Sequence, residues 1–372
     1  MRSTMRAALL MAAFIQAVSA QQPASPPQRV RSPEIHADRR VTFRLLAPKA
    51  GEVRLTGEFM KDPLALQKDD KGLWSVTAGP VAPDIYEYEL WIDGVAVVDP
   101  GNPAVKYNSR PGVVSSLLEV PGDQPLFYDI RRVPHGAVQV RWYTSKSLDA
   151  SRRLHVYTPP GYERGSARYP VLYLLHGADG DDSSWSWFGR ASQILDNLIA
   201  DKKLGPLVVV MPFGYAYPPT GAVEAARQRE GFTRDLIEDA IPFIQANYRV
   251  YTDRERRAIA GLSMGAGQAL AIGLHHLELF SRVAAFSGAG GANAAETFRD
   301  LAANPKKAND QLRLLWIGCG TEDGGFARVR EFSEFLNKSG VKHTFRSTEG
   351  AHTWIVWRRY LHELAPQFFP QS

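Results

Sequence analysis

The chain of 372 residues contains a single cysteine, Cys319. An intramolecular disulfide is therefore impossible, and the fold must rely on its apolar cores instead of cross-links. Cys319 lies inside the apolar run LRLLWIGCG, a pattern that predicts a buried strand. We therefore expect a packed, inert thiol and not a nucleophile at this position.

Sequence motifs for metals and nucleotides are also missing. The chain has no H-E-x-x-H, no cysteine pair, no G-x-x-x-x-G-K-[ST] and no dinucleotide-binding fingerprint. The glycine-rich stretch GAGGAN at 288–293 follows a late predicted strand and is typical of a loop. We therefore expect neither a metal nor a cofactor.

Charge of one sign is not concentrated in any segment. The formal net charge is +5, and the charged residues are scattered. A mildly basic chain without basic blocks does not indicate a nucleic-acid partner. The hydrophobic content of 44% and the charged content of 22% are those of a globular protein. The length suits two domains of ordinary size.

Long hydrophobic runs are absent outside the first twenty residues, MRSTMRAALLMAAFIQAVSA. Arg2 and Arg6 precede an apolar run that is too short to span a bilayer comfortably. Val18-Ser19-Ala20 then offers a small-residue cleavage site, so residues 1–20 have the features of a secretory signal peptide. We expect a secreted or periplasmic protein, cleavage after Ala20 and no membrane partner afterwards. An uncleaved anchor is the alternative.

Residues 21–121 change from a polar lead to a strand-like pattern. Residues 21–33, QQPASPPQRVRSP, predict a flexible lead. From 34 to 121 apolar residues alternate with the period of strands, and Asp93-Gly94 suits a type I′ hairpin turn. This region is predicted to be an all-β sandwich. Four aromatic residues are candidates for stacking on sugars, although alternation places at least half of them in the core: Trp74, Tyr86, Tyr88 and Trp91.

Residues 126–372 alternate continuous apolar runs with segments of helical period. The runs YPVLYLLHG, GPLVVVMPFG, RRAIAGL and LRLLWIGCG predict buried strands, and the segments between them predict helices. This order indicates an α/β domain with a mostly parallel sheet covered on both faces. Residues before Tyr169 are expected to add antiparallel strands at its start.

The stretch GLSMG at 261–265 lies between the predicted strand RRAIAGL and a predicted helix that runs to about His276. G-x-S-x-G at a strand–helix turn is typical of a nucleophile elbow, in which glycines let the backbone approach closely. Ser263 is therefore the candidate nucleophile. The alternative is a tight turn whose serine only caps the helix.

A serine nucleophile needs a base and an acid that orients the base. Asp323 follows the strand LRLLWIGCG, and His352 follows a later strand, so both are expected at the carboxyl edge of the sheet. Glu322 is an alternative to Asp323. His176 also ends a strand, but it precedes Ser263, and we interpret it as structural.

The oxyanion of the reaction needs two preorganised N–H donors. The backbone of Met264, the residue after the nucleophile, is one candidate, and that of Ala178, after the strand VLYLLHG, is the other.

Four segments in the order YPVLYLLHGADGDDSSW, GLSMGAGQ, GCGTED and GAHTWIVW resemble carbohydrate esterase family one, in its bacterial feruloyl and acetylxylan esterase branch. The resemblance covers about residues 128–369 and implies an esterase D-like α/β-hydrolase fold. VTFRLLAPKAGEVRLTGEF and YEYELWIDGVAVVDPGNP are similar to the early-set, immunoglobulin-like carbohydrate-binding modules that precede such esterases.

The resemblance implies that Ser263 is the nucleophile, His352 the general base and Asp323 its orienting acid. It implies the same oxyanion hole, from Met264 and Ala178. Trp185, in DDSSW, falls where relatives place an aromatic near the substrate, and loop packing is its other interpretation.

The resemblance further implies an esterase that removes feruloyl groups from plant cell-wall arabinoxylan through an acyl-enzyme, so that its partner is a polysaccharide. Three alternatives remain open: an acetylxylan esterase, an enterochelin-type siderophore esterase and a non-catalytic glycan-binding protein.

Cleavage after Ala20 predicts that the exported protein begins at Gln21. Amino-terminal sequencing of protein recovered from the periplasm or medium checks this expectation. Recovery of membrane-bound protein that still carries residues 1–20 would favour the uncleaved anchor.

Overall fold

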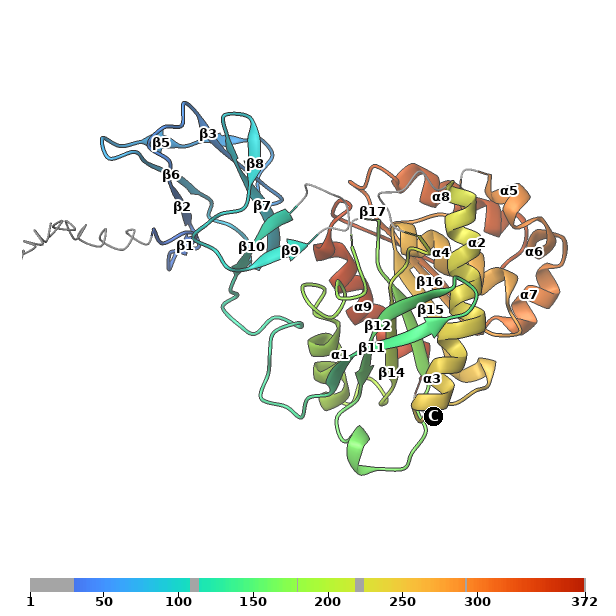
Figure 1. The fold of residues 1–372 in the computed structure, drawn as a ribbon. Helices are drawn as coiled ribbons and strands as arrows, with labels where there is room; N and C mark the ends of the chain where they lie inside the picture. The colour runs from blue at the N-terminus through green and yellow to red at the C-terminus, as the bar shows by residue number, and fades with distance from the viewer. Residues whose placement is uncertain (1–29, 108–113, 179, 218–223, 292, 371–372) are drawn as a thin grey trace, which may run out of the picture.

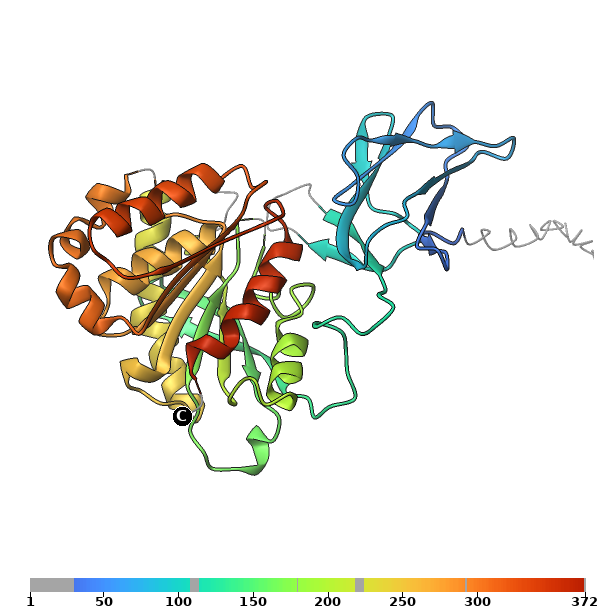
Figure 2. The ribbon, with the colours of Figure 1, turned by 180° about the vertical axis from the view of Figure 1, so that it is seen from behind.

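The computed structural model describes residues 30–107, 114–178, 180–217, 224–291 and 293–370. The predicted signal peptide and residues 21–29 of the predicted lead lie outside this part of the chain. Figures 1 and 2 show a β-domain, formed by strands β1–β10, beside a larger α/β domain that runs from β11 to α9.

The β-domain consists of two sheets within the described residues, with strand orders β1-β2-β6-β5 and β4-β3-β7-β10-β9, and with β8 paired to β7. Apolar side chains from both sheets form one core, which includes Phe43, Leu55 and Leu90. The strands are β1 (Glu34–Ile35), β2 (Val41–Leu46), β3 (Val53–Gly57), β4 (Leu64–Ala65), β5 (Gln67–Lys68), β6 (Leu73–Ala78), β7 (Asp84–Ile92), β8 (Val95–Val97), β9 (Val105–Tyr107) and β10 (Val114–Val120).

The hairpin between β7 and β8 has the turn that the sequence predicts. Asp93 and Gly94 both have positive φ, 48° and 85°, as a type I′ turn requires. Ile92 pairs with Val95 across the turn.

The aromatic side chains of the β-domain are mostly core residues. Trp74, Tyr86 and Tyr88 are buried, whereas Trp91 is 37% exposed. The alternation correctly predicts that at least half of the four are core residues: the three buried side chains pack inside the sandwich and do not offer a face to a sugar. Among these four aromatic residues, only Trp91 is exposed enough to contact a ligand.

The α/β domain is built on one sheet, whose described strands have the order β11-β12-β14-β13-β15-β16-β17-β18. β11 and β12 are antiparallel to their neighbours, and β13–β18 run parallel, as predicted. The strands are β11 (Ala137–Ser145), β12 (Ala150–Thr158), β13 (Val171–Leu175), β14 (Val208–Pro212), β15 (Arg257–Leu262), β16 (Arg282–Phe286), β17 (Leu314–Gly320) and β18 (Thr344–Thr348).

Helices follow the strands as the sequence predicts, and short helices between β16 and β17 were not predicted. A π-helical segment (Asp235–Ala240) joins α2 to α3, and short 3₁₀ turns occur at Tyr162–Arg164 and Arg254–Arg256. The helices are α1 (Ala191–Ala200), α2 (Ala225–Arg234), α3 (Ile241–Asn247), α4 (Met264–His275), α5 (Ala294–Thr297), α6 (Arg299–Ala303), α7 (Pro305–Gln311), α8 (Phe326–Lys338) and α9 (Trp354–Phe368).

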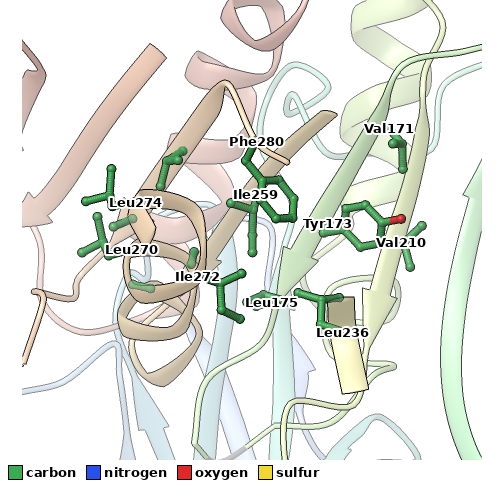
Figure 3. Packing of buried hydrophobic residues seen from close by; sticks show 14 of the residues in the cluster. Val171, Tyr173, Leu175, Val210, Leu236, Ile259, Leu270, Ile272, Leu274 and Phe280 are labelled. Carbon is green, nitrogen blue, oxygen red and sulfur yellow. The ribbon is translucent and has the colours of Figure 1, made fainter. Parts of the chain in front are cut away.

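Alternate residues of the central strands enter two separate cores, one on each face of the sheet. Tyr173 and Leu175 pack with α4 and α8, whereas Leu172 and Leu174 pack with α1 and α9. Figure 3 shows residues of the first layer, among them Ile272 of α4 and Leu175 of β13. Figure 2 shows α9 on the other face. Burial of both faces explains the continuous apolar strands.

A buried ion pair joins the two domains. Arg358 of α9 and Asp84 at the start of β7 are both buried, and Arg358 Nη2 donates to Asp84 Oδ1 at 2.7 Å and to the carbonyl of Ile85 at 2.9 Å. Tyr128 also donates its hydroxyl to Asp84, at 3.0 Å. Because these charges are shielded from water, removal of one partner leaves the other uncompensated.

Arg358→Met is expected to lower the free energy of unfolding by about 3–5 kcal/mol, because the buried Asp84 carboxylate would lose the only buried cationic partner that it has among the described residues. Arg359→Met is the matched control: Arg359 is exposed and lies 3.4 Å from Asp84, so its loss should cost about 1 kcal/mol or less. Urea unfolding followed by tryptophan fluorescence measures both. Equal midpoints for the two variants would contradict a structural role for the buried pair.

Candidate active site

Ser263 occupies a strained turn between β15 and α4. Its φ is 52° and its ψ is −114°, a conformation that non-glycine residues rarely adopt and that costs about 1–3 kcal/mol. A Cβ at Gly261 would overlap the carbonyl of Gly265, and one at Gly265 would lie 2.5 Å from the carbonyl oxygen of His176. The flanking glycines are therefore required by the close approach of three backbone segments.

The structure brings Ser263, His352 and Asp323 together from three loops. His352 Nε2 accepts from the Ser263 hydroxyl at 3.0 Å, and His352 Nδ1 donates to Asp323 Oδ2 at 2.7 Å. These bonds assign the tautomer with the proton on Nδ1, which a general base toward Ser263 requires. The predicted convergence is present, and the catalytic roles of the three residues are predictions that follow from it.

Asp323 is held as a carboxylate by its hydrogen bonds. Burial alone would raise its pKa, but the bonds from His352 and from the backbone N–H of Gly325 outweigh burial and keep the pKa of Asp323 below its usual range. Glu322, the alternative acid, is exposed, and Asp323 occupies the position beside His352.

His176 has the structural role that the sequence suggested. Its Nδ1 donates to the carbonyl of Gly177 at 2.7 Å, and its Nε2 accepts from the backbone N–H of Gly214 at 2.8 Å. Burial lowers the pKa of His176, which favours the neutral ring that this bonding pattern needs. His176 thereby ties the loop after β13 to the loop after β14.

Cys319 is buried in β17, as predicted. Burial, followed by the charge of Asp323, raises the pKa of the Cys319 thiol to about 12. The thiol therefore stays protonated and unreactive at neutral pH.

The two predicted oxyanion donors flank Ser263. Met264 is the first residue of α4, and Ala178 lies in the loop after β13. Met264 and Ala178 line different pockets, and Ser263 lines both. An oxyanion hole would need both backbone N–H groups to donate to the carbonyl oxygen of an ester bound at Ser263, and this role stays a prediction.

Trp185 is a core residue, which corrects the expectation of substrate contact. It is 1% exposed, its indole N–H donates to the carbonyl of Leu175 at 3.0 Å, and its ring packs edge-on against Trp354. Loop packing is therefore the correct one of its two interpretations. Trp357 packs edge-on against His352, with ring centroids 4.9 Å apart, and donates to Ser287 at 3.0 Å.

Two pockets meet at Ser263 and His352. The first, of about 110 Å³, is lined by both domains and is called here the interdomain pocket; Glu58, Glu87 and Lys106 are its β-domain residues. The second, of about 490 Å³, is called the loop pocket, and it lies between Met264, the loop after β16 and residues 323–329. An ester has two halves on either side of its carbonyl, and the two pockets offer a place for each.

Sequence reasoning did not identify Glu58, Glu87, Lys106 or the loop-pocket residue Arg328. Glu58, Glu87 and Lys106 come from three separate parts of the other domain, directly after β3, on β7 and on β9. No local pattern in the chain marks them as neighbours of Ser263.

Other candidate sites are weaker. A depression of about 370 Å³ between α4 and α5–α7 contains His275, but this imidazole bonds to the carbonyls of Ala271 and Thr297 and faces no nucleophile. Among the described residues, no cluster of His, Cys, Asp and Glu could hold a metal ion. None of the helices in these ranges is long and apolar enough to cross a membrane.

Comparison with known proteins identifies relatives of both domains. The family model Esterase, described as "Putative esterase", matches residues 145–368. An endo-1,4-beta-xylanase/feruloyl esterase of Xylanibacter ruminicola is 33% identical over 91% of this chain and 46% of its own length. The chain spans about half the length of the curated relatives that it matches.

Solved structures share the fold. A CE1 ferulic acid esterase from Anaeromyces mucronatus is 25% identical with a TM-score of 0.56, over 68% of this chain and 100% of that one. The enterobactin esterase of Shigella flexneri is 20% identical with a TM-score of 0.65, over 88% of this chain and 93% of that one. The second likeness shows the fold alone, in this case across both domains.

Gly265→Ala is expected to lower stability by about 1–3 kcal/mol and to reduce ester hydrolysis, because the added methyl group must displace the loop that carries His176. Gly267→Ala is the matched control on the same helix. Its Cβ would lie 3.6 Å from the nearest atom, so the variant should be up to about 1 kcal/mol more stable. Thermal unfolding and hydrolysis of p-nitrophenyl acetate measure the two effects. A Gly265→Ala variant as stable and active as Gly267→Ala would show that the elbow tolerates a side chain.

Proposed function

The chain belongs to the Esterase family, and from this premise we propose that it is an exported serine esterase that removes feruloyl groups from plant cell-wall arabinoxylan. The observation that carries the proposal is the hydrogen-bonded series Ser263–His352–Asp323 at the junction of two pockets. A bonded hydroxyl, imidazole and carboxylate in this order constitute an activated nucleophile.

The reaction proceeds in two halves. Ser263 Oγ attacks the ester carbonyl while His352 Nε2 takes its proton, and Asp323 stabilises the imidazolium that forms. The backbone N–H groups of Met264 and Ala178 stabilise the tetrahedral oxyanion. His352 then protonates the departing alcohol, which leaves an acyl-enzyme on Ser263. A water molecule, deprotonated by His352, releases the acid and restores the serine.

Two relatives support the feruloyl group as the acyl half of the substrate. The Xylanibacter ruminicola relative is named an endo-1,4-beta-xylanase/feruloyl esterase and aligns with 91% of this chain, so the alignment extends into the β-domain. The Anaeromyces mucronatus structure is a ferulic acid esterase in complex with ferulic acid. The xylanase part of the first name supports a xylan-derived polysaccharide as the alcohol half.

Wild-type protein is expected to release ferulate from wheat or corn arabinoxylan, and Ser263→Ala is expected to release none, because the variant lacks the attacking oxygen. Ferulate and acetate released from the same polymer are measured together by liquid chromatography. The Ser263→Ala variant controls for contaminating esterases.

Release of acetate without ferulate would overturn the feruloyl assignment in favour of an acetylxylan esterase. Hydrolysis of ferric enterobactin but not of methyl ferulate would favour a siderophore esterase. Failure of a fluorophosphonate to label Ser263 would favour a glycan-binding protein without catalysis.

A further inference from the structure

The β-domain contributes one wall of the pocket that contains the candidate nucleophile. Glu58 follows β3, Glu87 lies on β7 and Lys106 on β9, and all three line the interdomain pocket together with Ser263 and His352. The α/β domain alone leaves this side of the pocket open. The wall has a definite chemistry, with two carboxyl groups and one ammonium group.

The wall is internally bonded. Lys106 Nζ donates to Glu87 Oε1 at 2.5 Å and lies 5.2 Å from the centroid of the Phe188 ring. Glu58 Oε2 accepts the backbone N–H of Glu87 at 2.9 Å, and the Glu58 N–H donates to the carbonyl of Glu87 at 3.0 Å, which continues the pairing of β3 with β7. Lys106 is buried, whereas Glu58 is an exposed residue that also lines the pocket. The ammonium is therefore fixed, and the Glu58 carboxyl is accessible to a ligand.

Glu58 can accept and donate hydrogen bonds near neutral pH. The protein atoms around its carboxyl and the negative charge of Glu87 raise the pKa of Glu58 to about 7, against the opposing effects of the Glu87 N–H, Lys106 and Arg358. Part of the Glu58 population is therefore protonated near neutral pH. A carboxyl group that is present in both protonated and ionised forms suits a hydroxyl partner, because a hydroxyl group both donates and accepts hydrogen bonds.

Besides Ser263, His352 and Thr353, the rest of the interdomain pocket has apolar side chains. Trp354, Trp357 and Leu262 line it together with the glycine-containing loop after β13. A pocket with aromatic and aliphatic groups and one polar wall suits an apolar ring or chain that bears a hydroxyl group.

Contacts between the domains hold the wall in position. Besides the Arg358–Asp84 pair, Arg190 Nη2 donates to Glu119 at 2.6 Å, and the Trp187 indole N–H donates to the carbonyl of Val105 at 3.4 Å. Val105 directly precedes Lys106. The active-site loop that ends at α1 is thus tied to the strands that carry the wall.

We propose that Glu58, Glu87 and Lys106 of the β-domain form a binding subsite for a hydroxyl group of the ester substrate. The subsite makes the β-domain a determinant of substrate choice and not solely a neighbouring module. The inference rests on the proposed function for the identity of the ester. The hydroxyl has two possible sources, the phenolic ring of the acyl group and the sugar of the alcohol.

The test compares Lys106→Met and Glu58→Leu with the control Glu89→Gln in the full chain. Glu89 lies two residues from Glu87 on the same strand and does not line the pocket. Methyl ferulate is compared with methyl 3,4-dimethoxycinnamate, which lacks the phenolic hydroxyl. Feruloylated arabinose is compared with methyl ferulate, which lacks the sugar.

If the acyl group supplies the hydroxyl, the two wall variants should lose about 5- to 10-fold in kcat/KM on methyl ferulate and retain wild-type kcat/KM on the dimethoxy ester. If the sugar supplies it, the loss should appear only on feruloylated arabinose. Glu89→Gln should match the wild type throughout. Glu58→Gln, a smaller change, repeats the test if Glu58→Leu shows a lower thermal unfolding midpoint.

Equal losses on all substrates, or no loss on any, would overturn the subsite while leaving the esterase assignment intact. If wild-type protein hydrolyses no feruloyl ester, the proposed function fails, and binding then tests the subsite separately. Calorimetry on Ser263→Ala would compare ferulic with 3,4-dimethoxycinnamic acid, and arabinose with buffer alone. A preference for the hydroxylated ligand that Lys106→Met abolishes supports the subsite; no such preference, or one that survives the substitution, refutes it.

Discussion

The close approach of the β15, α4 and β13 backbones at Gly261 and Gly265 is the constraint on which the active site depends. No Cβ fits between these segments at the two glycines. The chain turns sharply at Ser263, which lies between them and has a φ of 52°. A strained residue of this kind persists only where its surroundings hold it. Here β15 lies between β13 and β16 in the sheet, and the Ser263 N–H donates to the carbonyl of Phe286 at 2.8 Å. The centre of the sheet therefore holds Ser263 in the strained conformation that positions its hydroxyl group.

The same helix serves both the candidate catalytic base and the contact between domains. α9 begins two residues after His352, carries Trp357 against the imidazole, and places Arg358 on Asp84 of the β-domain. Burial of that charge pair is favourable only while both partners remain in place. The position of His352 is thus coupled to the packing of the β-domain, which also supplies one wall of the interdomain pocket. The two domains, whose cores meet at Ile85 of β7 and Ile355 of α9, together line this pocket.

The chemistry of the site was predictable because its residues sit in local contexts that are informative. Ser263 lies between two glycines at a strand–helix change, and Asp323 and His352 each follow a predicted strand, so all three are expected at one edge of the sheet. Asp93-Gly94 was equally informative, since a type I′ turn needs two residues that tolerate positive φ. The aromatic residues were less predictable, because the sequence around an aromatic side chain is the same whether the ring packs in a core or contacts a ligand. Four aromatic candidates are in fact buried: Trp74, Tyr86, Tyr88 and Trp185.

The sequence by itself determined the alternation of strands and longer helices in the α/β domain, its mostly parallel sheet and the three residues of the candidate triad, because periodicity and turn chemistry are properties of neighbours along the chain. Only the tertiary structure decided that Asp323 and not Glu322 faces His352, that Trp185 belongs to the core, and that Glu58, Glu87 and Lys106 reach the pocket of Ser263. Those outcomes depend on how separate strands and two domains pack against one another. Residues such as Lys106 and Ser263 are far apart in sequence, and no local pattern encodes the contact between the surfaces that carry them.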